Sequence, residues 1–160
     1  NVLEEFAPRT TEAMSEETAQ IMLKMLRGVV DGAYCKSVGK RIGTGVRLRF
    51  RYDIRNPVAG KTGTTQNYSD GWFMGVTPDL VSGVWVGCED RSVHFRSMSL
   101  GQGATMALPV WAYYMQQVYA DTTITISKGA FEPSSAVPIT IETDCNKYQT
   151  TKQETTESFD

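Results

Sequence analysis

The chain has 160 residues, of which 41% are hydrophobic and 21% charged, a length and balance typical of one globular domain. Sixteen Lys and Arg residues against eighteen Asp and Glu residues give a formal net charge of −2, so the overall charge indicates no nucleic-acid partner. The cysteines (Cys35, Cys88 and Cys145) are too few and too far apart for a Cys-x-x-Cys site or a disulfide scaffold. No apolar run approaches the roughly 18 residues that span a bilayer.

The first predicted element is a helix that opens at Ser15. The chain starts at Asn1 without a signal-peptide pattern, and we interpret it as a piece of a longer protein. After Ser15, apolar residues recur at helical spacing along one face: Ala19, Met22, Leu26 and Val29. Gly32 is typical of the position just past a helix C-terminus.

Residues 33–45 indicate a basic, Gly-rich loop, and residues 46–52 a strand. In the second segment four apolar or aromatic residues alternate with three arginines: Val46, Leu48, Phe50 and Tyr52 against Arg47, Arg49 and Arg51. This period of two predicts a half-exposed strand. The arginines are compatible with an anion-binding stripe or a solvated edge face, and we favour the solvated face.

Three further strands are predicted, from Val58 to Thr64, Trp72 to Val76 and Leu80 to Val86. The sequence Thr77-Pro78-Asp79 is typical of a turn, so the last two strands should pair as a hairpin. Both faces of this hairpin are apolar, which requires cover on both faces of the sheet.

A polar loop at residues 88–102 precedes a second helix, from about Ala104 to Tyr119. The loop holds the only histidine, His94, which has no Cys or carboxylate at metal spacing, so we expect no metal there. The helix carries one apolar stripe, which we interpret as core rather than a cofactor site: Leu108, Trp111, Met115 and Val118. Pro109 fits only the first turn or a kink.

Residues 121–160 are rich in Thr and poor in large apolar residues, and we expect a largely flexible C-terminal extension with at most a short strand near Ile139 to Ile141. The expected organisation is a folded segment over residues 1–120 followed by this extension. The expected fold class is α+β, an antiparallel sheet of about three to four strands with an N-terminal and a C-terminal helix packed on it.

Gly60-Lys61-Thr62 matches the end of a phosphate-binding loop, G-x-x-x-x-G-K-[ST]. That pattern requires Gly at position 55, where Arg55 stands, and a following helix whose backbone N–H groups hold the phosphate. The sequence continues with Gly63-Thr64-Thr65-Gln66-Asn67, which indicates a strand end and a turn. We therefore reject a nucleotide site.

Lys61-Thr62-Gly63 also matches the Lys-Thr-Gly element of serine acyl-transferases that bind penicillin. On a strand at a surface cleft, Lys61 would place a positive charge beside a substrate carboxylate, and the hydroxyls of Thr62 and Thr64 would hydrogen-bond to it. Gly63 would let the substrate backbone approach closely. The Thr64 N–H would face the developing oxyanion, and Thr65 completes the candidate substrate-binding residues.

Segments on both sides of this element extend the match. They are Gly43-Thr44-Gly45, Asp70 to Pro78, Gly83 to Gly87, Gly101-Gln102-Gly103-Ala104 and Ala107 to Trp111. Together they resemble the C-terminal part of the transpeptidase domain of class A (bifunctional) penicillin-binding proteins. The resemblance covers about residues 15–120. Within it, the sequence pattern of residues 46–120 is similar to that of the branch found in Bacteroidetes-type bacteria.

The resemblance implies a partial serine transpeptidase/β-lactamase-like fold. For the parent protein it implies a peptidoglycan D,D-transpeptidase that binds peptide stems or β-lactams, needs no metal or cofactor, and is anchored at the periplasmic face of the inner membrane in the cell envelope. Two alternatives on the same fold are a β-lactamase-like hydrolase and a non-catalytic β-lactam sensor or interaction module.

Two motifs of the family precede Lys-Thr-Gly in its chain order: Ser-x-x-Lys, which holds the nucleophile, and Ser-x-Asn. Ser-x-Asn is absent, and Ser-x-x-Lys occurs once, from Ser37 to Lys40, in a Gly-rich loop instead of at the start of a helix. We reject Ser37 as the nucleophile and expect the chain alone to be inactive. Because its apolar hairpin lacks cover, we expect an oligomer or pairing with the missing upstream half.

Overall fold

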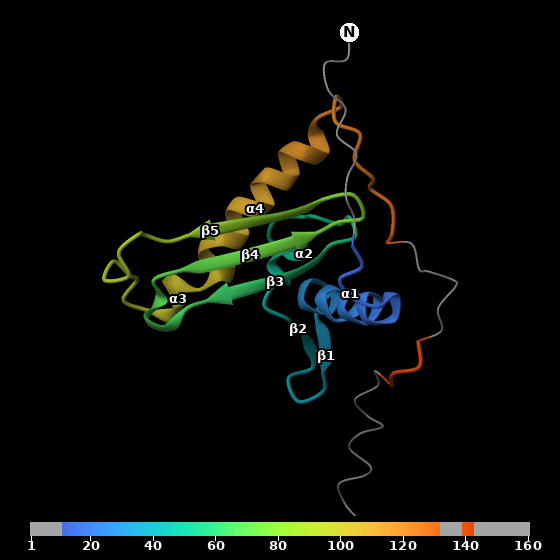
Figure 1. Cartoon of the computed structure of the whole chain (residues 1–160). Coiled ribbons are helices and arrows are strands. Elements are labelled where there is room, and N and C mark those ends of the chain that lie inside the picture. The colour runs from blue at the N-terminus through green and yellow to red at the C-terminus, as the bar shows by residue number, and fades with distance from the viewer. Residues whose placement is uncertain (1–10, 132–138, 143–160) are drawn as a thin grey trace, which may run out of the picture.

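A computed structural model of the chain describes residues 11–131 and 139–142, which form an α+β unit (Figure 1). The helices and strands in chain order are α1 (Glu16–Asp31), β1 (Ala33–Cys35), β2 (Lys40–Ile42), α2 (Arg47–Phe50), β3 (Ala59–Thr64), the 3₁₀ turn η1 (Gln66–Tyr68), β4 (Gly71–Val76), β5 (Val81–Val86), α3 (Met98–Gly101) and α4 (Gly103–Ala120). Strands β3, β4 and β5 form an antiparallel sheet in that order, and β1 and β2 form a separate hairpin. No helix in this part of the chain is long and apolar enough to cross a membrane.

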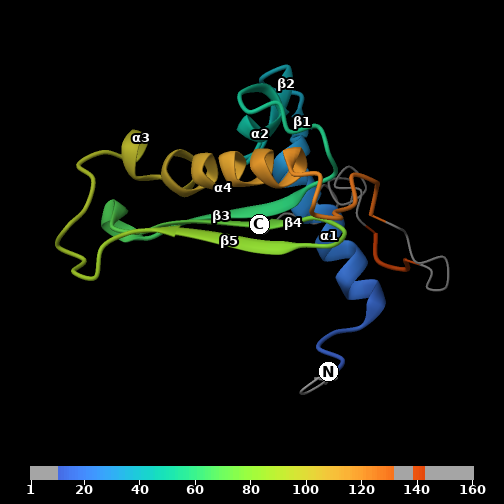
Figure 2. The same cartoon turned by 90° about the horizontal axis from the view of Figure 1, so that it is seen from above.

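The core lies between the three-stranded sheet and α4, which runs along one face of it (Figure 2). The predicted apolar stripe of this helix is confirmed, since Leu108, Trp111 and Met115 are fully buried. The Trp111 ring meets Phe73 of β4 edge-on at 5.1 Å, and its indole N–H donates to the Ser82 hydroxyl at 2.8 Å. Pro109 lies inside α4 and not in its first turn. Burial of these large side chains is the main source of stability for the sheet–helix pair.

The predicted β4–β5 hairpin is confirmed. Its turn is closed by the Thr77 N–H, which donates to the Leu80 carbonyl at 2.8 Å, and by the Leu80 N–H, which donates to the Thr77 hydroxyl at 3.1 Å. The register pairs Phe73 with Val84 on the core face. A period of two in the sequence therefore gave the correct face for each side chain.

The opposite face of the same hairpin is apolar and exposed. Trp72, Met74 and Trp85 retain 44%, 41% and 47% of their accessible surface, and the two indole rings lie 6.3 Å apart across the strands. Cover for both faces was expected from the sequence, and the described residues supply α4 on one face only. The indole pair is thus left facing solvent in this part of the chain.

The strand predicted over residues 46–52 is wrong, because the segment forms the short helix α2. The Arg49 guanidinium donates to Asp31 at 2.9 and 2.5 Å and to the Ile54 and Asn56 carbonyls at 2.7 Å each. The Arg47 guanidinium donates to the Ala104 carbonyl at 3.3 Å and the Thr105 hydroxyl at 3.2 Å. Neither a solvated face nor an anion stripe describes these two arginines, since they tie α2 to α1 and α4.

The loop predicted over residues 33–45 contains the β1–β2 hairpin, with Gly39 at φ 66° in its turn. The limits of α1 are confirmed, since the Ser15 hydroxyl accepts from the Thr18 N–H at 3.3 Å and Gly32 ends the helix at φ 76°. Its predicted apolar stripe is wrong in the first half of the helix, where Ala19 and Met22 are exposed. The buried residues of α1 are Ile21 and, near its end, Val30. Helix α1 packs chiefly on β3, so only part of its apolar surface is covered.

Residues 139–142 of the C-terminal extension have no strand conformation, where at most a short strand was expected. The Thr140 N–H and hydroxyl donate to the Glu17 carboxylate of α1 at 2.6 and 2.7 Å, and these bonds hold the pKa of Glu17 below its ordinary value. The rest of the expected C-terminal extension, residues 132–138 and 143–160, lies outside the described residues.

Candidate functional site

Strand β3 places the Lys-Thr-Gly element at the edge of the sheet, with β4 on one side only. Alternation along the strand puts Thr62 and Thr64 on one face and Lys61 on the other. Lys61 is exposed, as expected, and its ammonium donates to the carbonyl of Thr62 at 2.6 Å. The strand runs on to Thr64 and into a 3₁₀ turn, so the helix that a phosphate-binding loop requires does not follow.

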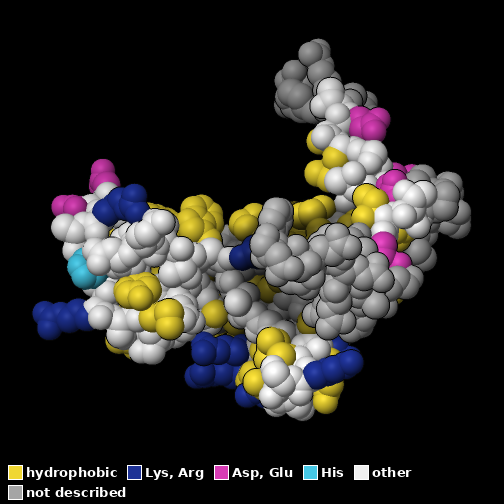
Figure 3. Space-filling model, turned by 90° about the horizontal axis from the view of Figure 1, so that it is seen from below, with side chains coloured by type: hydrophobic (Ala, Val, Ile, Leu, Met, Phe, Trp, Pro, Cys, Tyr) yellow, Lys and Arg dark blue, Asp and Glu magenta, His cyan; other side chains and the backbone are white. Residues whose placement is uncertain are grey.

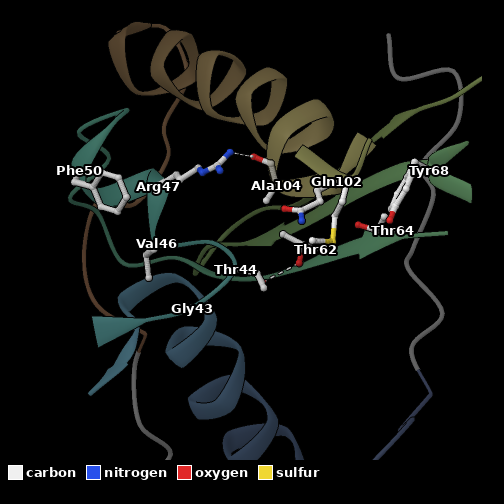
Figure 4. A pocket seen from close by; sticks show the side chains of 11 residues that line it. Gly43, Thr44, Val46, Arg47, Phe50, Thr62, Thr64, Tyr68, Gln102 and Ala104 are labelled. Carbon is white, nitrogen blue, oxygen red and sulfur yellow. Dashed lines mark hydrogen bonds between the residues drawn. The ribbon is translucent and has the colours of Figure 1, made fainter. Parts of the chain in front are cut away.

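A cavity of about 440 Å³ opens beside the Thr62 and Thr64 side chains (Figure 4). The remaining lining residues come from four other parts of the chain: Gly43, Thr44, Val46, Arg47, Phe50, Tyr68, Met98, Gln102 and Ala104. The lining mixes hydroxyl, amide and guanidinium groups with apolar walls, as is usual for a small-molecule or peptide site. Lys61 and Thr65 are not among the lining residues.

Thr44 faces Thr62 across the cavity wall. The Thr62 hydroxyl donates to the Thr44 hydroxyl at 2.8 Å, which leaves the proton of Thr44 available to a ligand oxygen (Figure 4). The preceding residue must be glycine, because a Cβ on Gly43 would lie 2.5 Å from the Val29 carbonyl of α1. Close packing of this loop on α1 therefore sets the position of Thr44.

The Thr64 hydroxyl is fixed from the other side, by α4. It accepts a hydrogen bond of 3.0 Å from the N–H of Gly103, the first residue of that helix. A Cβ on Gly103 would overlap the carbonyls of Gly63 and Trp72, so only glycine allows the helix to start here. Because the Thr64 oxygen accepts this bond, its proton stays available to donate to a ligand.

The Thr65 hydroxyl bonds within the turn that follows β3. It accepts from the Asp70 N–H at 3.0 Å and bonds the Asp70 carboxylate at 3.1 Å, so it closes the β3–β4 turn. The Ser69 hydroxyl at 2.8 Å is the largest cause that lowers the pKa of Asp70, with the Trp85 indole, Thr65 and Arg91 adding to it. This network around the Asp70 carboxylate, here called the hub at Asp70, holds the end of β3 in place.

Gly63 packs against the neighbouring strand β4. A Cβ at Gly63 would lie 3.1 Å from the Cβ of Trp72 on the neighbouring strand. The missing side chain thus gives room to Trp72 within the sheet.

Tyr68 is a lining residue that the sequence did not single out, and its backbone is left-handed. Asn67 and Tyr68 have φ values of 64° and 56°, which is rare for an aromatic residue and costs about 1–3 kcal/mol. A Cβ on Gly101 would overlap Tyr68, and the Tyr68 carbonyl accepts from the Phe95 N–H at 3.3 Å. The surrounding loop therefore forces the tyrosine into the cavity wall.

The remaining sequence candidates stay away from the cavity. Ser37 lies in the turn between β1 and β2, with Lys40 on β2, so the two do not share one face of a helix. The Ser37 hydroxyl bonds the Cys35 thiol at 3.1 Å and is the main cause that lowers the pKa of that thiol. His94 is exposed, and the described residues hold no group of three side chains able to bind a metal ion.

Two lining residues, Thr44 and Gln102, lie inside segments that carried the family resemblance but were given no role. A Gly-x-Gly frame around each was the available signal, since glycines on both sides let backbone approach backbone. Arg47 and Phe50 were assigned to a strand and so could not be placed at the cavity.

Comparison with known proteins points to one group. No family model matches the chain. Penicillin-binding protein 1A of Aquifex aeolicus is 36% identical over 117 residues, which cover 73% of this chain and 14% of that protein. Penicillin-binding protein 1A of Pseudomonas aeruginosa is 40% identical over 115 residues, 69% of this chain and 12% of that protein.

A solved structure agrees with these relatives. The crystal structure of penicillin-binding protein 1A from Haemophilus influenzae superposes with a TM-score of 0.56 at 28% identity, over 74% of this chain and 16% of that one. The chain thus spans only a small part of the proteins that it matches.

Proposed function

We propose that this chain, which is related to the transpeptidase region of class A penicillin-binding proteins, is the substrate-clamping segment of a serine-type peptidoglycan D,D-transpeptidase. One observation carries the proposal. Thr62 and Thr64 of an edge strand line a cavity, and Lys61 directly precedes them on the same strand. The proposed ligand of this clamp is a peptide that ends in a carboxylate, such as a D-Ala-D-Ala stem.

In the proposed reaction a serine hydroxyl from outside this chain attacks the carbonyl carbon of the penultimate D-Ala. The C–N bond breaks, terminal D-Ala leaves with the proton on its nitrogen, and an ester remains. An amine of a neighbouring stem then attacks the ester and restores the serine hydroxyl. Each step passes through an oxyanion, which the Thr64 backbone N–H would stabilise by a few kcal/mol.

The described hydroxyls would hold the substrate carboxylate. Thr64 and Thr44 each keep a hydroxyl proton for an anionic oxygen, because the oxygens already accept from Gly103 and Thr62. The Lys61 ammonium, now on the Thr62 carbonyl, would supply the positive charge at this edge of the sheet. Gly63 would let the substrate backbone approach β3 closely, and Thr65 would complete the substrate-binding residues at the turn that follows.

The parent protein would be anchored in the membrane and act at its periplasmic face, where peptidoglycan is cross-linked. The alternative of a β-lactamase-like hydrolase or a β-lactam sensor uses the same clamp with a different acyl acceptor or none. The similarity of the sequence pattern to the Bacteroidetes-type branch also stays a prediction.

We further propose that the chain does not work alone. The exposed Trp72–Trp85 face and the unpaired edges of the three-stranded sheet would be covered by upstream segments of the parent, or by another copy of the chain when it is isolated. Helix α1 adds exposed Met22 and Met25 to the surface available for such contacts.

Acylation of the parent protein by a labelled penicillin tests the proposal. Thr62→Val and Thr64→Val should each reduce the second-order acylation rate at least tenfold, because each removes a hydroxyl from the carboxylate clamp. Thr123→Val, in the exposed segment after α4, is the matched control and should leave the rate unchanged. Equal rates in all four proteins would reject the clamp.

A further inference from the structure

Positive charge is concentrated in one short part of this slightly acidic chain. Residues 32–52 contain no Asp or Glu and six of the sixteen basic residues: Lys36, Lys40, Arg41, Arg47, Arg49 and Arg51. Seen from below, several Lys and Arg side chains lie along the lower border of the molecule, where no acidic side chain is in view, and others lie elsewhere on this face (Figure 3). A local cationic field of this kind attracts anionic groups even when the net charge is negative.

The β1–β2 hairpin carries the outermost of these charges. It projects away from the sheet (Figure 1), with exposed Lys36 and Lys40 at its turn end and Tyr34 exposed to 62%. The register pairs Tyr34 with Arg41 on one face and Cys35 with Lys40 on the other. Both faces of the hairpin therefore present a cation to solvent.

Little of this charge is neutralised within the described part of the chain. Arg49 is paired with the carboxylate of Asp31. Arg41 donates to the Gly32 carbonyl at 2.7 Å and Arg47 to the Ala104 carbonyl, and these neutral acceptors leave the guanidinium charges in place. These charges attract anionic groups that come within a Debye length of about 8 Å.

The hairpin is continuous with the cavity. Strand β2 ends at Ile42, and the next two residues, Gly43 and Thr44, line the cavity wall opposite Thr62. Arg47 lines the same cavity. A long ligand that enters beside Thr62 would pass over the basic hairpin if it continues in that direction.

We propose that the β1–β2 hairpin is an exosite, a second binding surface next to the catalytic cleft, for the carboxylate-bearing glycopeptide strand of peptidoglycan. This inference rests on the proposed function, which supplies a polymer whose peptides carry free carboxylates. Lys36 and Lys40 bind those carboxylates at the turn end, and on the other face from Lys40 the exposed Tyr34 ring gives a flat apolar surface beside Arg41. A bilayer is the less suitable partner, because the turn at residues 36–39 offers a single large apolar side chain, Val38.

Co-sedimentation of the 160-residue chain with purified insoluble peptidoglycan tests the exosite. Lys36→Glu/Lys40→Glu should weaken binding at least tenfold, and added salt should weaken wild-type binding in the same way. Arg96→Glu/Lys128→Glu makes the same change in net charge at exposed positions elsewhere and should alter binding less than twofold. Peptidoglycan whose carboxylates have been amidated should no longer bind.

The experiments distinguish the exosite proposal from the clamp proposal. Thr62→Val should leave sedimentation unchanged, because the clamp is not needed for strand binding, whereas it lowers acylation of the parent. Equal binding by wild type and Lys36→Glu/Lys40→Glu would overturn the exosite, and so would an equal loss in both double variants. Binding to phosphatidylglycerol vesicles but not to peptidoglycan would also overturn it. None of these outcomes depends on acylation.

Discussion

The hydroxyl of Thr64 accepts a 3.0 Å hydrogen bond from the backbone N–H of Gly103, which joins the motif strand to the first turn of α4. The same helix start holds Gln102 at the cavity, and its later turns bury Trp111 against the sheet. The helix that forms the core therefore also sets the geometry of the candidate site. Changes at this junction should affect stability and ligand binding together.

Replacement of Thr64 by Val should lower the free energy of unfolding by about 1–2 kcal/mol, because the buried Gly103 N–H loses its acceptor. Thr64→Ser keeps the hydroxyl and should cost less than half as much. Urea unfolding of the two variants measures the difference. Equal stability of the Val and Ser variants would mean that the bond contributes nothing to the fold.

Gly103→Ala should destabilise the chain by about 1–3 kcal/mol, because the added Cβ overlaps the backbone of β3 and β4. Gly28→Ala is the matched control. It lies inside α1 with no atom within 4 Å of an added Cβ, and should gain about 0.5–1 kcal/mol from helix propensity. Thermal unfolding should move the two melting temperatures in opposite directions, and a fall in both would contradict the packing argument.

The hub at Asp70 predicts an acid-sensitive turn. The folded state lowers the pKa of Asp70, first through the Ser69 hydroxyl, so the folded form prefers the carboxylate. Its contribution is present above the unfolded pKa of about 3.9 and is lost as the pH falls from there through the lower folded pKa. Asp70→Asn should flatten this part of the stability profile, as followed by Trp fluorescence in urea between pH 5 and 2. An unchanged acid limb would show that Asp70 does not titrate in this way.

The sequence predicted the elements whose side-chain pattern is set by burial. Trp72 and Phe73 alternate between exposed and buried as a strand requires, and Trp111 lies on a helical stripe, so β4, β5 and α4 could be predicted. Residues 46–52 show the same alternation, yet they contain the helix α2. In this conformation Arg49 donates to Asp31 and to two backbone carbonyls. Those partners are tertiary, and a local pattern carries no information about them.

The residues around the cavity could likewise be predicted only in part from local sequence patterns. Thr62 and Thr64 could be proposed from a local motif, whereas Thr44, Tyr68 and Gln102 reach the cavity from separate loops. No signal in the sequence pointed to Tyr68, which has a left-handed backbone and packs against Gly101, a residue remote in sequence. Strands β1 and β2, with three residues each, are too short to show a period.

The exposed indole face predicts association of the isolated chain. At micromolar concentration we expect dimers or larger species in sedimentation velocity, together with binding of a dye that reports exposed apolar surface. Trp72→Gln/Trp85→Gln should shift the chain toward monomer. Tyr113→Gln/Tyr114→Gln, on the exposed side of α4, is the control and should leave the distribution unchanged. A monomeric wild type without dye binding would refute the prediction.

The most direct test of the account is the site of β-lactam attachment, read by intact mass and peptide mapping. The 160-residue chain treated with benzylpenicillin should show no covalent adduct, because the nucleophile is proposed to lie outside it. The parent protein should carry one adduct, on a serine upstream of Asn1. An adduct on the isolated chain, above all on Ser37, would contradict the account, as would a parent that is never acylated.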